Sequence, residues 1–235
     1  FKLEPSSVGA TVNLLLAAVL RTEEFTIENA AMEPDVVQLC NVLVKMGADI
    51  SGIGTDRITV RGVESLNGVE IANDPDRIEV GTFMIAGVLN PDSELTLEGC
   101  NVDHLGNLPE LLSKTGAKVD VNGTTIKVQA PKELEAVSIA TEVYPGFPTD
   151  MQAQWATMMT QANGVSTVTD TVYYDRFSYV PELTRLGADM RLEKNTVTIF
   201  GKTDFEGASV MSTDLRASVS LVLAAMVAEN ETEVL

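Results

Sequence analysis

The sequence predicts an α/β protein built from repeated βαβαββ units, with helices buried and strands outside. A Gly-Ala pair recurs about 70 residues apart, at Gly47, Gly116 and Gly187, each time after a run with the spacing of an amphipathic helix. Glycine at that position ends a helix because it takes the left-handed conformation without a steric penalty. A polar turn and a β-rich run follow each pair, so the regular spacing indicates a repeated architecture.

Each unit is expected to contain the same elements in the same order: an apolar helix, a β-rich run, an amphipathic helix and two closing strands. The apolar helices are expected at 8–20, 80–89 and 151–160, and the β-rich runs at 24–28, 94–98 and 166–172. The amphipathic helices are expected at 35–46, 104–115 and 179–186, and the last strands at 57–61, 124–128 and 196–200. A fourth copy opens at Asp214, with a helix over 217–228 and a strand over 231–235.

The apolar helices indicate an unusual layering. The run from Met151 to Thr160 is apolar or small on most of its faces. A helix of that kind is expected to be buried all round, which places helices inside and strands outside.

Composition indicates a globular chain. Its 235 residues are 45% hydrophobic and 21% charged, enough for one large core or two smaller ones. The longest apolar stretches are shorter than the roughly 20 residues of a membrane span, so no membrane association is expected. Two cysteines, Cys40 and Cys100, do not make a disulfide framework and fit a reducing cytoplasm.

The formal charge of −18 argues against nucleic acid as a partner, because nucleic-acid binding needs clustered Lys and Arg. An anionic small molecule needs only local positive potential, which a helix N-terminus and one or two arginines can supply. The first apolar helix begins at Ser7, Val8 and Gly9, whose small side chains leave backbone N–H groups approachable by a diphosphate. The alternative for Ser7 is plain N-capping.

Motifs along the whole length carry a resemblance to a known family. They are Ser7–Thr11, Ile27–Ala31 with Glu33 and Pro34, Gly54–Ile58, Pro75–Phe83, Phe147–Gln154, Arg176–Phe177 and Ala208–Ser218. With these motifs in the family's order, the chain resembles the UDP-N-acetylglucosamine 1-carboxyvinyltransferases, a group of enolpyruvyl transferases.

The resemblance implies an inside-out α/β barrel, the enolpyruvyl transferase fold, in two domains with the active site in the cleft between them. Residues 1–74 would be the closing part of one domain, and residues 75–235 most of the other, ending inside a repeat. The chain is therefore interpreted as an internal piece of a longer polypeptide, inactive without the missing N- and C-terminal parts.

The implied reaction belongs to cytoplasmic peptidoglycan synthesis. It moves the enolpyruvyl group of phosphoenolpyruvate to the 3-hydroxyl of UDP-N-acetylglucosamine and releases phosphate. No metal and no organic cofactor is implied.

The resemblance also implies catalytic roles for Asp150, Arg176 and Arg216. Asp150 would remove the proton of the sugar hydroxyl, and both arginines would bind phosphoenolpyruvate, whose two anionic groups match the guanidinium fork. The alternative for Asp150 is an N-cap of the helix that starts at Met151. For the arginines it is pairing with the adjacent aspartates, Asp175 and Asp214.

Substrate-binding roles are implied for Ser7, Val8 and Gly9 at the nucleotide diphosphate, and for the backbone of Val172 near the sugar. Arg77 is interpreted as structural and His104, the only histidine, as a surface residue at a helix start. Cys40 is expected to be buried as a small hydrophobic side chain.

Two functions from different classes remain. One is an active enolpyruvyl transferase; the other is a non-catalytic relative that binds a UDP-sugar and acts through protein partners. The joint presence of Asp150, Arg176 and Arg216 favours the enzyme, because a protein that only binds would be free to lose them.

Overall fold

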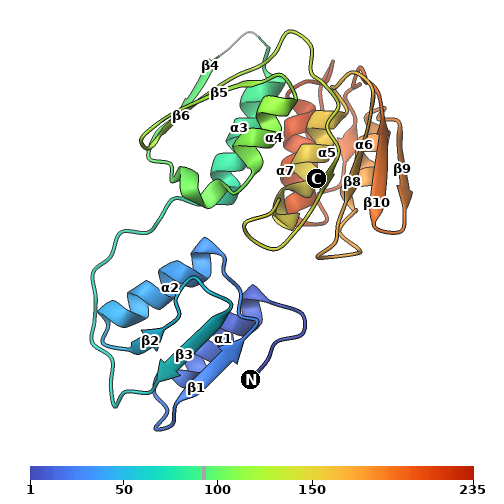
Figure 1. The fold of residues 1–235 in the computed structure, drawn as a ribbon. Helices are drawn as coiled ribbons and strands as arrows, with labels where there is room; N and C mark the ends of the chain where they lie inside the picture. The colour runs from blue at the N-terminus through green and yellow to red at the C-terminus, as the bar shows by residue number, and fades with distance from the viewer. Residues whose placement is uncertain (92–93) are drawn as a thin grey trace. The chain divides into compact units, whose positions relative to one another are not determined.

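The structure is a computed structural model that describes residues 1–91 and 94–235 (Figure 1). It divides into two compact units, Phe1–Asp74 and Pro75–Leu235. Each unit contains helices and strands around a hydrophobic core of its own, so the predicted α/β class is confirmed. Within the described residues, no helix combines the length and the apolar character needed to cross a bilayer.

The first unit is a three-stranded sheet with two helices. Its elements are α1 (Val8–Ala18), β1 (Phe25–Glu28), α2 (Pro34–Lys45), β2 (Asp49–Ser51) and β3 (Arg57–Arg61). The strands are antiparallel in the order β1-β3-β2. Ile58 and Val60 of β3 are fully buried, whereas Arg57 and Arg61 at the two ends of the strand are exposed, so the helices cover one face of the sheet.

The second unit contains the remaining elements. Its first part holds α3 (Arg77–Leu89), β4 (Glu94–Leu97), the 3₁₀ turn η1 (Val102–Leu105), α4 (Leu108–Lys114), β5 (Lys118–Asn122) and β6 (Thr125–Gln129). The middle part holds β7 (Ile139–Ala140), the 3₁₀ turn η2 (Thr149–Met151), α5 (Gln152–Met159), β8 (Val165–Thr169), α6 (Tyr179–Arg185), β9 (Met190–Glu193) and β10 (Thr196–Phe200). The last part holds β11 (Ser209–Val210), α7 (Leu215–Ala225) and β12 (Glu233–Val234).

The middle part is a complete βαβαββ unit, as the sequence predicts. Its four strands form one sheet in the order β7-β8-β10-β9, with β7 parallel to β8 and the other pairs antiparallel. The first unit has the same plan, because Lys2 pairs in parallel with Glu28 before α1 begins. The last part repeats the opening, since β11 and β12 pair in parallel on either side of α7 in the sequence.

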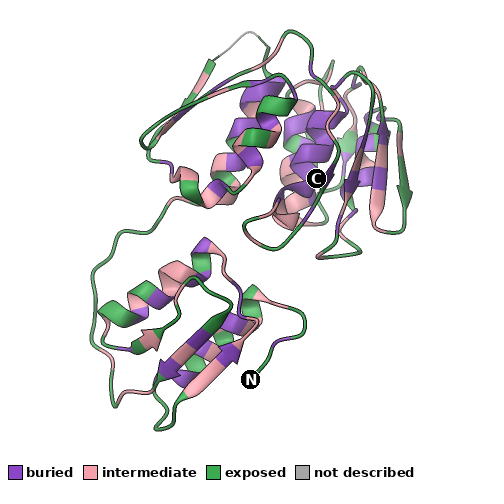
Figure 2. Cartoon of the chain, viewed as in Figure 1, coloured by how far each residue is buried: buried purple, intermediate pink, exposed green. Residues whose placement is uncertain are grey.

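Helix α5 packs against both α3 and α7. Every residue of α5 is buried, and the strands lie outside it (Figure 2). The expectation of burial on all sides is confirmed for α5 and is wrong for three other apolar helices, which expose Leu16 of α1, Phe83 of α3 and Val222 of α7.

Two of the differences from the sequence-based element boundaries have a clear structural cause. The helix expected over 104–115 is broken into η1 and α4, because Gly106 adopts φ 57° and ψ −130° and a Cβ there would lie 2.4 Å from the carbonyl oxygen of Pro145. The strand expected to reach Val172 ends at Thr169, because the side chain of Asp170 accepts the backbone N–H groups of Val172 and Tyr173 and turns the chain. Val172 is therefore a loop residue.

Candidate functional site

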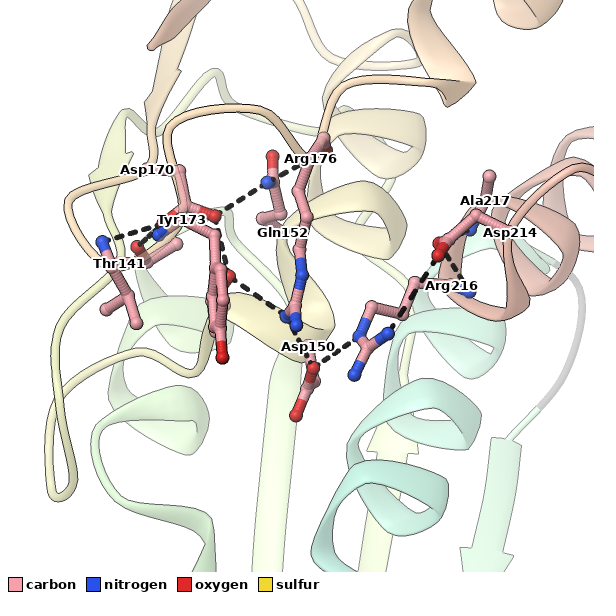
Figure 3. Close-up of polar contacts among 11 residues, drawn as sticks. Thr141, Asp150, Gln152, Asp170, Tyr173, Arg176, Asp214, Arg216 and Ala217 are labelled. Carbon is pink, nitrogen blue, oxygen red and sulfur yellow. Dashed lines mark hydrogen bonds and ion pairs between the residues drawn. The ribbon is translucent and has the colours of Figure 1, made fainter. Parts of the chain in front are cut away.

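Three charged side chains converge at one end of the second unit (Figure 3). Oδ1 of Asp150 accepts a hydrogen bond from Nη1 of Arg176 at 2.7 Å and a very short one from Nε of Arg216. Asp150 comes from η2, Arg176 from the loop between β8 and α6, and Arg216 from the first turn of α7. The structure thus brings together the three residues that the sequence predicts as catalytic.

Local structure sets these positions. Asp214 caps α7 by accepting the backbone N–H groups of Arg216 and Ala217, at 2.9 and 3.2 Å, and so holds Arg216 at the helix start. Pro148 precedes η2, the single turn that leads into α5. No side chain caps η2 or α5, so the alternative that Asp150 is an N-cap is wrong. Its carboxylate is held by the arginines instead.

The environments of the two arginines differ. Arg176 is about one-fifth exposed, lies 3.9 Å from the ring centre of Tyr173 and donates to Oγ1 of Thr149 at 3.3 Å. It pairs with Asp150 rather than with the adjacent Asp175. Arg216 is more exposed, and its Nη1 also lies 3.9 Å from Oδ2 of Asp214, so the expected local pairing is present as a second, longer contact.

Asp150 and the two arginines each have atoms that can form further hydrogen bonds. Within residues 1–91 and 94–235, no hydrogen bond reaches Oδ2 of Asp150, Nε and Nη2 of Arg176, or Nη2 of Arg216. A guanidinium carries five N–H donors in a planar fork, so each arginine can bind an anion while it keeps Asp150. The site therefore offers a carboxylate oxygen next to two anion-binding groups.

A cavity of about 720 Å³ extends from this site along the second unit. Asp150 and Arg216 lie at its polar part, while Phe83 of α3 and Val222 of α7 are among its apolar lining. The volume is within the usual range for a small-molecule pocket.

A second polar cluster, centred on Asp170, adjoins the site and was missed by the sequence analysis. Asp170 is fully buried, and its carboxylate accepts from Thr149, the neighbour of Asp150, and from Gln152 at 2.6 and 2.8 Å (Figure 3). A Thr-Asp-Thr run after a β-rich segment indicates a turn. The sequence carries no signal that this carboxylate would be buried and bonded to the site.

Of the residues expected at the sugar and the diphosphate, Val172 lies in the same loop as Arg176, and its N–H is held by Asp170 at 2.8 Å. Ser7, Val8 and Gly9 lie in the first unit. The Ser7 hydroxyl accepts from the N–H of Ala10 at 3.3 Å, so the expected N-cap is present. Val8 and Gly9 are exposed, and a Cβ built at Gly9 meets no atom within 4 Å, so this helix start is open.

The residues expected to be structural have structural contacts. His104 lies in η1 and contacts the amide of Asn101 at 2.9 Å, and Arg77 lies over the ring of Tyr144 at 5.7 Å. Cys40 is fully buried, and burial raises the pKa of its thiol to about 11. In the described part of the chain, no cluster of His, Cys, Asp and Glu could hold a metal ion.

Comparison with known proteins adds to this geometry. The whole chain, residues 1–235, matches the family described as EPSP synthase (3-phosphoshikimate 1-carboxyvinyltransferase). The chain belongs to this family. Its curated relatives include a UDP-N-acetylglucosamine 1-carboxyvinyltransferase of Chlorobaculum parvum, 47% identical over 98% of this chain, and one of Desulfosudis oleivorans, 46% identical over 97%. This member of the EPSP synthase family spans about half the length of either relative, 54% in both cases.

Solved structures of the family agree with the fold. The enolpyruvyl transferase NikO from Streptomyces tendae superposes with a TM-score of 0.87 at 30% identity, over 97% of this chain and 54% of that one. An EPSP synthase from Acinetobacter baumannii superposes with a TM-score of 0.73 at 18% identity, over 100% of this chain and 57% of its own, and supports the fold alone.

Proposed function

We propose that the protein containing this chain transfers the enolpyruvyl group of phosphoenolpyruvate to the 3-hydroxyl of UDP-N-acetylglucosamine and releases phosphate. The observation that carries the proposal is the contact of Arg176 and Arg216 with one oxygen of Asp150. The names of the curated relatives that match 97–98% of the chain support the choice of acceptor.

Asp150 is the proposed general base. A sugar hydroxyl is a weak nucleophile near neutral pH, and a carboxylate within hydrogen-bond reach can remove its proton as the new C–O bond forms. Both arginines contact Oδ1, so Oδ2 is the oxygen that accepts the hydroxyl proton.

Arg176 and Arg216 are the proposed anion-binding groups. The hydroxyl oxygen adds to C2 of phosphoenolpyruvate while C3 takes up a proton, and loss of phosphate with a C3 proton restores the double bond. Phosphate and carboxylate remain charged throughout, so guanidinium groups can bind them in the intermediate as well as in the substrate. The partial burial of both arginines strengthens these contacts relative to bulk water.

The other residues implied by the resemblance are proposed to bind the acceptor, UDP-N-acetylglucosamine. The backbone N–H groups of Val8 and Gly9, with the Ser7 hydroxyl, are proposed to bind the diphosphate at the start of α1, where the helix dipole favours an anion. The backbone of Val172 is proposed to contact the sugar, since its loop also carries Arg176.

The two units of the chain are proposed to belong to two different domains. Residues 1–74 form the closing part of one inside-out α/β barrel domain and residues 75–235 most of the other, ending inside a repeat. The buried α5 and the strands outside it support this interpretation. The reaction would take place in the cytoplasm as a step of peptidoglycan synthesis, with no metal or organic cofactor.

The experiment compares two acceptors. The protein as encoded is incubated with phosphoenolpyruvate and either UDP-N-acetylglucosamine or shikimate 3-phosphate, and released phosphate is measured. We expect release with the nucleotide sugar and none with shikimate 3-phosphate. Release with shikimate 3-phosphate alone would overturn the acceptor. Binding of UDP-N-acetylglucosamine without any phosphate release would support a non-catalytic UDP-sugar-binding protein that acts through partners.

A further inference from the structure

We propose that Asp170 is a positioning residue, which holds Arg176 and the turn containing Asp150 in the geometry that the transfer requires. The inference rests on the proposed function. Asp170 directly follows β8 and is fully buried. Its side chain does not touch Asp150, so it acts through its neighbours.

The Asp170 carboxylate accepts five hydrogen bonds from three segments of the chain. The donors to Oδ1 are Oγ1 of Thr141 at 2.7 Å and the backbone nitrogens of Val172 and Tyr173 at 2.8 Å each; the donors to Oδ2 are Oγ1 of Thr149 at 2.6 Å and Nε2 of Gln152 at 2.8 Å. Thr141 directly follows β7, and Val172 and Tyr173 lie in the loop after β8. Thr149 and Gln152 are the first residues of η2 and of α5. One carboxylate therefore joins three segments that come from different parts of the repeat.

A carboxylate in this position requires its partners. Burial of a carboxylate without hydrogen bonds is strongly unfavourable, so a conformation that moved one segment away would be disfavoured. Three of the five donors are amide N–H groups, which can only donate, so each of them needs an acceptor oxygen at this position. The backbone of Asp170 is itself fixed, because its N–H and C=O both bond to Asn195 at 2.8 Å.

Arg176 is held by groups that Asp170 binds. Thr149, which donates to Asp170, accepts from Nη1 of Arg176 at 3.3 Å. Gln152 donates through Nε2 both to Asp170 and to the carbonyl oxygen of Arg176, at 2.8 and 3.0 Å. Tyr173, whose N–H is bonded to Asp170, lies over the guanidinium at 3.9 Å. Side chain and backbone of Arg176 are thus both constrained by this network.

A buried tyrosine completes the network. Oη of Tyr179 donates to Oε1 of Gln152 at 3.0 Å, which turns Nε2 of that amide toward Asp170. Burial, together with the negative charge of Asp170, raises the pKa of Tyr179 well above its ordinary value, so the phenol keeps the proton that it donates.

The equivalent turn of the first repeat is held by fewer side-chain hydrogen bonds. Lys2 pairs with Glu28 there as Ala140 pairs with Thr169 in the later repeat, so Asn29 occupies the position of Asp170. Asn29 is only half-buried, and its side chain makes a single hydrogen bond, to the carbonyl oxygen of Leu3 at 2.9 Å. One bond is enough for the turn, so the five bonds of Asp170 serve the segments that carry Arg176 and Asp150.

The first test is Asp170→Asn in the protein as encoded. The amide presents an N–H₂ group to donors that need an acceptor, so Thr149 and Gln152 must reorient and Arg176 is released. We expect kcat/KM for phosphoenolpyruvate to fall by about 10²-fold at a temperature where the variant is folded. The control is Thr115→Val. It removes a buried hydrogen bond from the Thr115 hydroxyl to the carbonyl oxygen of Leu112, at the end of α4. It should lose stability and keep wild-type kinetics.

A second pair of variants covers the case in which Asp170→Asn does not fold. Thr149→Val removes the hydroxyl between Asp170 and Arg176, and Thr149→Ser retains it. We expect the valine variant to lose kcat/KM for phosphoenolpyruvate and the serine variant to restore most of it. Folded valine and serine variants with equal kinetics would overturn the proposal.

A readout independent of turnover separates this inference from the proposed function. The side-chain ¹H–¹⁵N signal of Arg176, assigned by its loss in Arg176→Lys, should shift and broaden in Thr149→Val and in Asp170→Asn. An inactive wild-type protein in which these shifts occur would refute the transferase but retain the positioning role. Unchanged Arg176 signals in a folded Asp170→Asn variant would refute the positioning role.

Discussion

Nη1 of Arg176 lies 2.7 Å from Oδ1 of Asp150, although 26 residues separate them in the sequence. Arg216, 66 residues beyond Asp150, contacts the same oxygen. The three side chains come from a 3₁₀ turn, a loop and a helix start, and each is between about one-fifth and one-third exposed. Their convergence depends on the packing of α5 against α7 and on the loop that follows β8.

Lysine substitutions should separate charge from hydrogen-bond geometry at the arginines. Arg176→Lys and Arg216→Lys keep a positive charge but lose the planar fork, so we expect KM for phosphoenolpyruvate to rise by about 10-fold or more in each. Steady-state kinetics with each substrate varied in turn measure this effect. Arg191→Lys, at an exposed pair with Glu193 on β9, is the control. Wild-type KM values in both site variants would mean that the arginines do not bind this substrate.

The break between η1 and α4 should depend on glycine at position 106. Gly106 and Gly123 have similar positive φ angles, 57° and 60°, but a Cβ meets the Pro145 oxygen at 2.4 Å only at Gly106. Alanine at either position costs about 1–3 kcal/mol for the positive φ, and Gly106→Ala should cost about 1–3 kcal/mol more for the clash. Urea unfolding of both variants measures the difference. Equal free energies of unfolding would show that the contact with Pro145 is not a constraint.

The buried thiol of Cys40 should make stability depend on alkaline pH. Burial raises its pKa from the ordinary value of 9.0 to about 11 in the folded protein. Between these values the unfolded thiol loses its proton while the folded one keeps it, so the free energy of unfolding should fall as the pH rises. Urea unfolding of the wild type and of Cys40→Ala across this window tests the effect. The alanine variant should have the shallower pH dependence, and identical slopes would contradict the assignment.

Repeat periodicity made most of the fold predictable from the sequence. The strands over 57–61 and 196–200 are found as predicted, because a run of β-branched residues between turns is a local signal. The break at Gly106 was not predictable, because it depends on the carbonyl of Pro145, which lies far away in the sequence. The exposed faces of α1, α3 and α7 were also missed, since an apolar composition does not say how many neighbours a helix has.

The site was predictable only through resemblance. Composition and spacing place Asp150 at a helix start, where capping is the ordinary role, and the structure instead gives it two arginines. Asp170 was missed because its role depends on donors from three segments that meet only in the folded chain. The sequence around it is that of an ordinary turn.

The most direct test of the proposed chemistry is the turnover of Asp150→Asn in the protein as encoded. Asparagine keeps the size and one acceptor oxygen but cannot take a proton from the sugar hydroxyl. We expect kcat for phosphate release to fall by about 10²–10⁴-fold, with little change in thermal stability because the lost ion pairs are partly exposed. Asp120→Asn, which removes an exposed ion pair with Lys118 on β5, is the control and should keep wild-type turnover. An Asp150→Asn variant that turns over like the wild type would contradict the account, whatever its stability.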